Sequence, residues 1–199
     1  MKKALKGLSG IKVFEILKNT ETEYKVGEAI PIPYAQKLTR DVKSSSDPIY
    51  ADDDIYDDEE VIEGEDFELE IPEADLSMFP ILEGGTFDEV EKEYTWGGNA
   101  GKEYGLTFKS KKKDGNYRMF RYYRAKFKKV KQDLQTADNG TSISILTVIG
   151  TFYRRAYKAE GEVFPAMRTY KDSETSSDLA WLDTIPTIPT PVVESQGNT

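Results

Sequence analysis

The densest group of chemically capable side chains is an acidic cluster between residues 52 and 59. Its members are Asp52, Asp53, Asp54, Asp57, Asp58 and Glu59. Several carboxylate oxygens at close spacing are the ligands that Ca²⁺ takes in proteins. The cluster lacks the central glycine of a helix-loop-helix calcium loop, so we favour an exposed or partner-facing segment. A calcium site is the minor alternative, and the sequence predicts no metal and no cofactor.

Other catalytic chemistry is scarce. The chain has no histidine and no cysteine, which removes the commonest general base, the commonest metal ligand and any thiol nucleophile. A pair of carboxylates could hydrolyse a sugar, but among so many acids any pair is expected by chance. Gly97 to Lys102 resembles a phosphate loop without its Lys-Ser/Thr ending. We therefore predict no catalytic residues and no enzyme activity.

Basic and aromatic residues alternate between residues 108 and 129, as on surfaces that bind nucleic acid. Strands also display such residues simply because their side chains alternate. A net charge of -9 disfavours general affinity for a polyanion. A nucleic-acid-binding β-barrel therefore stays as an alternative.

Charge is segregated along the chain. No Lys or Arg occurs from Asp47 to Glu91, whereas Glu103 and Asp114 are the only acids from Lys102 to Lys131. The two regions are either solvated faces or complementary patches for a head-to-tail contact between copies. The candidate basic contact is a hairpin that carries Lys111, Lys112 and Lys113.

Alternating apolar residues predict strands over 11–16, 24–33, 38–43, 61–71, 104–108, 117–129, 142–152 and 164–170. Asp114-Gly115 is typical of a hairpin turn. One helix is expected over 73–83, stopped by Gly84-Gly85. The fold class is therefore mainly β: an antiparallel β-sandwich or barrel with one flanking α-helix, an extended loop and a C-terminal arm.

We expect one domain over residues 1–171, with a long acidic loop over 44–60, and an extended, partly disordered C-terminal tail over 172–199. The loop combines acids with residues that favour burial, so we interpret it as an arm between subunits. The arm residues are Tyr50, Asp52, Asp53, Asp54, Ile55, Tyr56, Asp57 and Asp58.

An ordered set of motifs resembles the major tail proteins of siphophages that infect Gram-positive bacteria, the phi13 family. The resemblance spans residues 6–164, and its second motif stands where the family has Leu-Tyr-Ala-Asp-Asp. The motifs are Lys6-Gly7-Leu8, Ile49-Tyr50-Ala51-Asp52-Asp53, Phe67-Glu68-Leu69-Glu70-Ile71, Leu106-Thr107-Phe108-Lys109-Ser110, Asp114-Gly115-Asn116-Tyr117-Arg118, Tyr123-Arg124-Ala125-Lys126-Phe127 and Thr147-Val148-Ile149-Gly150-Thr151-Phe152.

The resemblance implies a structural subunit of the virion tail, assembled in the bacterial host cytoplasm. Such subunits form hexameric rings that stack head to tail into a hollow tube, with the tape measure, tail terminator and distal tail proteins as partners. Phage DNA passes through only as cargo, and no membrane is involved. The alternative within this class is a tube or ring protein of a related injection or secretion system.

An acidic face on the strand over 61–71 is the last candidate. Phe67, Leu69 and Ile71 point one way, and acids point the other. In a tube this face lines either the lumen, where it would repel DNA, or a contact with the basic hairpin. The candidate residues are Glu63, Glu65, Asp66, Glu68 and Glu70.

Overall fold

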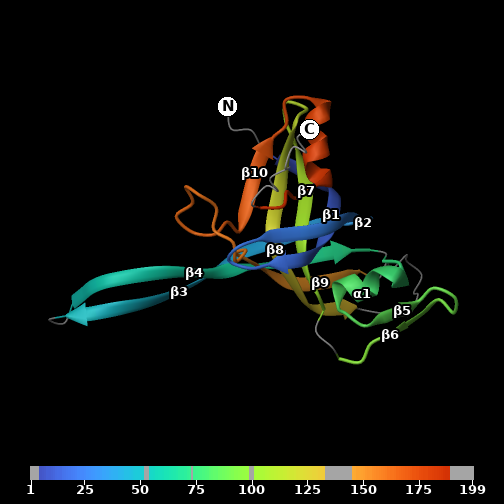
Figure 1. The fold of residues 1–199 in the computed structure, drawn as a ribbon, viewed down its shortest axis with the longest axis horizontal. Helices are drawn as coiled ribbons and strands as arrows, with labels where there is room; N and C mark the ends of the chain where they lie inside the picture. Colours follow the sequence, from blue (N-terminus) through green and yellow to red (C-terminus); the bar gives the residue numbers. More distant parts are fainter. Residues whose placement is uncertain (1–4, 52–53, 73, 99–100, 133–144, 189–199) are drawn as a thin grey trace, which may run out of the picture.

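The computed structural model describes residues 5–51, 54–72, 74–98, 101–132 and 145–188 (Figure 1). One large sheet contains eight strands, and a separate hairpin contains two short ones. The large sheet is built from β1 Leu5–Asn19, β2 Tyr24–Ile32, β3 Lys37–Ala51, β4 Asp54–Ile71, β7 Glu103–Lys112, β8 Tyr117–Gln132, β9 Leu146–Tyr153 and β10 Arg168–Asp172. The hairpin is β5 Thr86–Asp88 with β6 Glu93–Thr95.

Every strand pair in the sheet is antiparallel, which confirms the predicted mainly β, antiparallel class. The order is β2-β1-β7-β8-β9-β4-β3, with β10 also paired to β8. Strand β8 pairs with three other strands, β7, β9 and β10. The first half of β8 lies between β7 and β10. Its second half pairs with β9, on the same edge of β8 that β10 occupies further up the strand. This arrangement lets one continuous sheet turn around its own core.

The core consists mainly of aromatic rings from distant strands. Phe67 on β4 stacks on Phe152 of β9, with ring centroids 4.3 Å apart, and Phe152 stacks on Tyr122 of β8 at 3.8 Å. Gly150 leaves room for this stack, because a Cβ there would lie 2.4 Å from the Phe67 ring. Ile32 of β2, at one end of the sheet, belongs to the same cluster, and Leu38 of β3, at the other end, packs against it.

The predicted helix over 73–83 is largely wrong. The structure has a 3-10 turn, Leu76–Met78, followed by a single α-helical turn, α1, Phe79–Leu82. Asp75 caps the first turn by accepting the Ser77 N–H at 2.8 Å. Pro80 lies at the start of α1, where a missing N–H costs nothing, but it cannot continue a helix from upstream. Glu73, the predicted first residue, lies outside the described residues.

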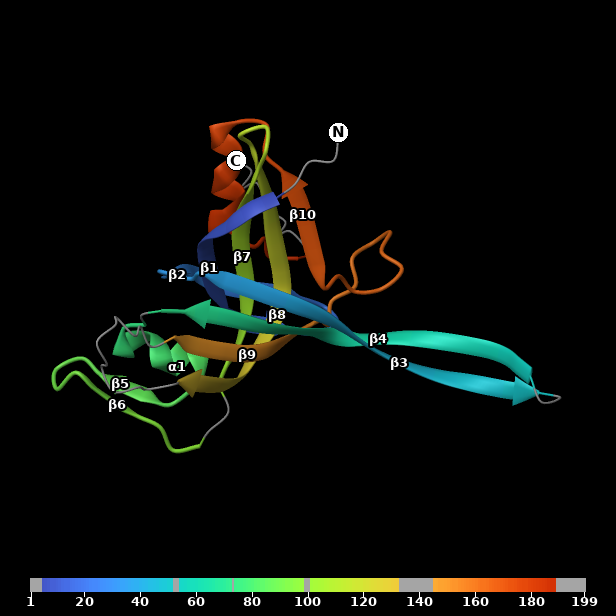
Figure 2. The same ribbon diagram turned by 180° about the vertical axis from the view of Figure 1, so that it is seen from behind.

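The loop predicted over 44–60 is also wrong, because β3 and β4 continue through it as a paired ribbon. Register pairs run to Ala51↔Asp54. Strand β4 pairs with β9 only up to Glu65↔Phe152, so among the described residues the ribbon beyond that pair is two-stranded. A shift in register at Ile62 to Gly64 marks a bulge, which bends and twists a ribbon. Figures 1 and 2 show the ribbon projecting from the body.

The extended tail predicted from residue 172 is wrong for residues 172–188, which fold back onto the body. They include a 3-10 helix, η2, Ser176–Asp183. Leu182 and Ile185 are buried, and Ile188 forms an antiparallel bridge with Tyr24. Ile185 and Ile188 pack in a second cluster with Phe14 and Tyr24 of the strands. Residues 189–199 lie outside the described part. No helix among the described residues has the length and hydropathy needed to cross a membrane.

Candidate assembly surfaces

The root of the ribbon is held by a buried carboxylate, Glu65, which is 2% exposed. The carboxylate accepts hydrogen bonds from Arg40 Nη1 at 2.9 Å and from the Tyr122 hydroxyl at 3.2 Å. Arg168 of β10 also pairs with it. Glu65 therefore joins β3, β8 and β10 at the point where the ribbon leaves the body. Its burial contradicts the prediction that it lines a lumen or a contact.

The sequence assigned Glu65 to the wrong face. Side chains alternate along a strand, so Glu65 shares the inward face of Phe67 and Leu69. Tyr122 completes the polar pocket around it. Burial, with a hydrogen bond to Tyr170 adding to the effect, raises the pKa of the Tyr122 phenol far above its usual value. The phenol therefore stays protonated and is available as a donor to Glu65.

Three of the predicted acids do share an outer face of β4. Glu68 is exposed, while Asp66 and Glu70 are half-buried beside cations. Glu70 pairs with Lys37 at 2.6 Å, and Asp66 lies 3.8 Å from Lys128 Nζ. Glu63 is exposed in the bulge. The face is thus less negative than the β4 sequence alone suggests.

The ribbon, defined here as residues 44–62, carries most of the predicted arm residues on paired strands. Tyr50 lies opposite Ile55, and Ile49 lies opposite Asp57, with Tyr56 displaced from the register. The segment contains no Lys or Arg, and the next cation along the chain is Lys92. Asp52 and Asp53 lie outside the described residues, as do the side chains of 46–60, so calcium binding there stays an untested alternative. Among the described residues no cluster suits a metal ion.

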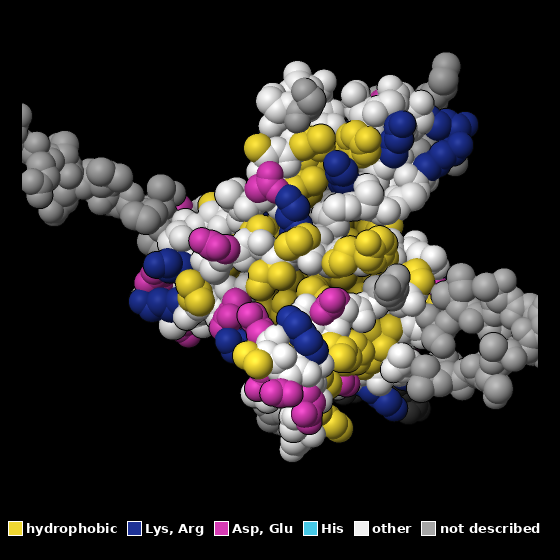
Figure 3. Space-filling model, turned by 90° about the vertical axis from the view of Figure 1, so that its right-hand side faces the viewer, with side chains coloured by type: hydrophobic (Ala, Val, Ile, Leu, Met, Phe, Trp, Pro, Cys, Tyr) yellow, Lys and Arg dark blue, Asp and Glu magenta, His cyan; other side chains and the backbone are white. Residues whose placement is uncertain are grey.

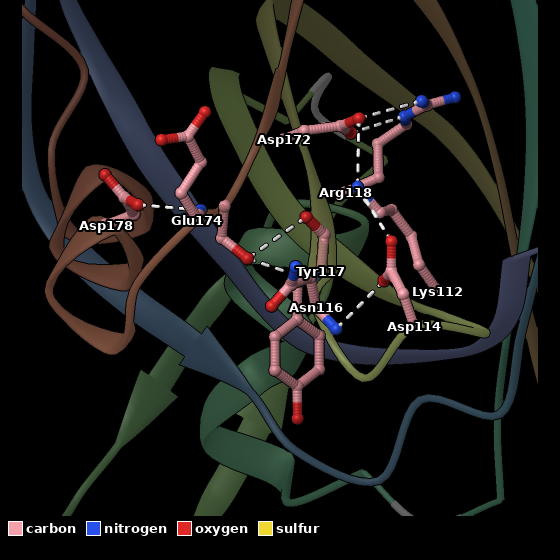
Figure 4. Close-up of polar contacts among 9 residues, drawn as sticks. Lys112, Asp114, Asn116, Tyr117, Arg118, Asp172, Glu174 and Asp178 are labelled. Atoms are coloured by element: carbon pink, nitrogen blue, oxygen red, sulfur yellow. Dashed lines mark hydrogen bonds and ion pairs between the residues drawn. The ribbon is translucent and has the colours of Figure 1, made fainter. Parts of the chain in front are cut away.

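The predicted basic hairpin is partly neutralised by its own chain (Figure 4). Lys112 is buried and lies 3.1 Å from Asp172 and 3.8 Å from Asp114. Arg118 binds Asp172 through both Nε, at 2.8 Å, and Nη2, at 3.1 Å. The Arg118 hydrogen bond, reinforced by Lys112, lowers the pKa of the Asp172 carboxyl to about 2. Lys112 is therefore wrong as a contact residue, while Lys111 and Lys113 remain exposed.

Neighbouring arginines of β8 also form hydrogen bonds and ion pairs within the subunit. Arg121 donates to the carbonyl oxygens of Trp181 and Thr184 at 2.9 and 2.7 Å. Arg124 forms a two-pronged pair with Glu103 at 2.7 and 2.8 Å. These pairings fix the C-terminal segment and the β7–β8 sheet. They leave fewer cations for a polyanion than the sequence indicates.

Sequence reasoning missed two surface features. Val42, Ile62 and Phe164 are exposed around a hollow of about 340 Å³ at the root of the ribbon. A second hollow, of about 450 Å³, lies between Trp96 and the end of β8. An isolated Trp in a glycine-rich loop was the only sequence signal for the second.

No family model matches the chain, and no curated protein matches it. Solved structures with a partial likeness include an extended PVC sheath-tube complex of an extracellular contractile injection system, 7% identical with a TM-score of 0.42, covering 82% of this chain and 89% of that one. The tube-terminating cap of the anti-feeding prophage is 7% identical with a TM-score of 0.43, covering 82% and 88%. The sixfold-symmetrised baseplate of the same prophage is 10% identical with a TM-score of 0.41, covering 84% and 93%. TM-scores this low assign neither a fold family nor a function.

Proposed function

We propose that this chain is a non-enzymatic structural subunit that assembles with copies of itself into the hollow tail tube of a phage-like particle. One observation carries the proposal: within the described part of the chain, the ribbon over 44–62 leaves the body with no third strand paired to it. An isolated two-stranded ribbon is marginally stable in water, so a partner surface is expected to support it. Its length and acidity suit a contact with another subunit rather than a tight turn.

The finer form of the proposal follows the resemblance to the phi13 family. Copies form hexameric rings, the rings stack head to tail, and the tube of a non-contractile tail conducts DNA. The tape measure, terminator and distal tail proteins would meet it at the tube's interior and ends. In this account Asp66, Glu68 and Glu70 face either the lumen or a neighbouring ring.

The nucleic-acid-binding alternative is less well supported by the geometry. Four cations of this region each bind a carboxylate or carbonyl of their own chain: Lys112, Arg118, Arg121 and Arg124. Binding a phosphate would first break those pairs. A tube that conducts DNA also benefits from few free cations, because every phosphate contact adds affinity and slows passage.

The test replaces residues 47–59 with Asn-Gly, which keeps the Ser46↔Glu60 register pair and closes it with a two-residue turn. We expect the body to melt as in the wild type, because the core clusters of the described residues draw on no residue of the ribbon. We expect assembly to be lost in sedimentation velocity. The control removes charge from another exposed turn, as Glu89→Gln/Glu91→Gln, and should assemble normally. Normal assembly of the shortened variant would refute the role of the ribbon.

A further inference from the structure

The hollow beside Trp96 brings an exposed aromatic ring together with lysines of β8. Trp96 follows β6 and is 56% exposed. With the second half of β8 it encloses a space of about 450 Å³, whose lining also includes Glu83, Lys126, Lys128, Lys129 and Val130. We call this hollow the Trp96 groove. An exposed tryptophan beside aliphatic and cationic side chains is typical of a contact site rather than of a free surface.

Two lysines of the groove lack a counter-charge within the described part of the chain. Neither Lys126 nor Lys129 forms an ion pair there, and the nearest carboxylate to Lys128 Nζ, on Asp66, is 3.8 Å away. Glu83 is the one acid in the lining, and it lies near the phenol of Tyr94, whose pKa burial raises to about 12. The groove therefore presents net positive charge in a chain of net charge -9.

The groove and the ribbon lie at opposite ends of the subunit. The ribbon adjoins the place where β4 parts from β9, at Glu65, whereas the other end of β4, Ile71, leads to α1, β5 and β6. Figures 1 and 2 show the ribbon on one side and α1, β5 and β6 on the other. Figure 3 views the side away from the ribbon, and apolar side chains gather over much of it. The ribbon therefore cannot reach its own groove.

The ribbon has the chemistry that the Trp96 groove would bind. It carries Ile49, Tyr50, Ile55 and Tyr56 among acids that no cation of the same segment neutralises. Tyrosine and isoleucine can cover Trp96, and the neighbouring carboxylates can pair with the free lysines.

We propose that the Trp96 groove receives the acidic ribbon of a second copy of this chain. This inference rests on the proposed function and names the receiving surface for the ribbon. A contact between two different patches at opposite ends is heterologous, so each copy both gives a ribbon and accepts one. Such contacts extend into closed rings or helical stacks.

The competing receiver is the β7–β8 hairpin tip. Lys112 is already bound to Asp172 there, which leaves Lys111 and Lys113 as exposed charges. Surface lysines of this kind contribute little to affinity. The groove has the same number of free lysines as the hairpin tip, and it also has an aromatic ring and a concave shape.

The test reverses two charges in the groove, as Lys126→Glu/Lys129→Glu, and measures assembly of the full chain by sedimentation velocity. We expect the protein concentration needed for assembly to rise at least about tenfold, because two charge pairs become repulsive. The matched control, Lys111→Glu/Lys113→Glu, makes the same change in net charge at the hairpin tip and should assemble as the wild type does. Circular dichroism checks that both variants remain folded.

A compensating variant tests the pairing itself. Adding Asp57→Lys/Asp58→Lys to the groove variant should restore assembly, while the ribbon change alone should weaken it.

Fluorescence gives a second readout. Emission from Trp96 should shift to the blue when copies associate, and the shift should be absent in Trp96→Phe. Undiminished assembly of the groove variant beside an assembling wild type would overturn the groove and leave the tube proposal standing. A wild type that never associates would overturn both.

Discussion

Glu65→Gln is the change that most sharply tests how the ribbon is anchored. The substitution keeps the shape of the side chain and removes the charge that Arg40 and Arg168 share. Removing one partner of a buried ion pair costs about 3–5 kcal/mol, because the remaining charge is left uncompensated. Here the side chains of Arg40 and Arg168 are 29% and 39% exposed, so water solvates part of the residual charge. We therefore expect a loss of about 2–3 kcal/mol in the free energy of unfolding.

For a chain of this length, about 1 kcal/mol corresponds to a shift of roughly 2–4 °C in Tm, so Glu65→Gln should melt about 4–12 °C lower. The assay is urea and thermal denaturation followed by circular dichroism, below the concentration at which copies associate. Glu68→Gln is the matched control. It removes an exposed acid of the same strand and should change stability by no more than about 0.5 kcal/mol. Equal stabilities of the two variants would refute the anchoring role of Glu65.

Three further outcomes follow from the same contacts. Truncation after Lys171 should lower Tm, because it removes the buried side chains of Leu182 and Ile185, and Ile185 is part of the second core cluster, whereas truncation after Ile188 should preserve the melt. Gly150→Ala should destabilise the core by about 1–3 kcal/mol, since the new methyl would meet a phenylalanine ring, while Gly97→Ala, in open space, should be neutral apart from a small change in chain entropy. Asp172 has a depressed pKa of about 2, so its stabilising effect is full above about pH 4 and is lost as pH falls toward 2. Because its side chain is 42% exposed, the effect is about 1 kcal/mol or less, and the stability difference from Asp172→Asn should vanish across that range.

The strands of the body were predictable because their side chains alternate with a period of two, and burial on one face leaves a clear pattern. The buried side chains of Phe67, Leu69 and Ile71 illustrate this pattern. The hairpin turn at Asp114-Gly115 was predictable from its residue types, and it joins the paired strands β7 and β8. The same alternation also places Glu65 inward, and treating it as part of a continuous acidic face was the error. Only tertiary contacts reveal the two arginines that make its burial tolerable.

The ribbon, the helix and the C-terminal segment were harder to predict for different reasons. An acidic composition is typical of loops, and it hid the strand propensity of the tyrosines and isoleucines in 44–62. Pro80 shortened the helix, as its missing N–H requires. Serine, threonine and proline after residue 171 suggested an open tail, yet Leu182 and Ile185 are buried, and Ile185 packs in the apolar cluster of Phe14 and Tyr24. The Trp96 groove joins the loop after β6 to β8, which no local pattern indicates.

Electron microscopy of the purified full chain in negative stain tests the central claim most directly. The account predicts hollow rings or stacked tubes with sixfold end views, formed without nucleic acid, and loss of these particles when residues 47–59 are replaced by Asn-Gly. A chain that remains monomeric at high concentration, and that instead binds DNA in a salt-sensitive manner, would contradict it.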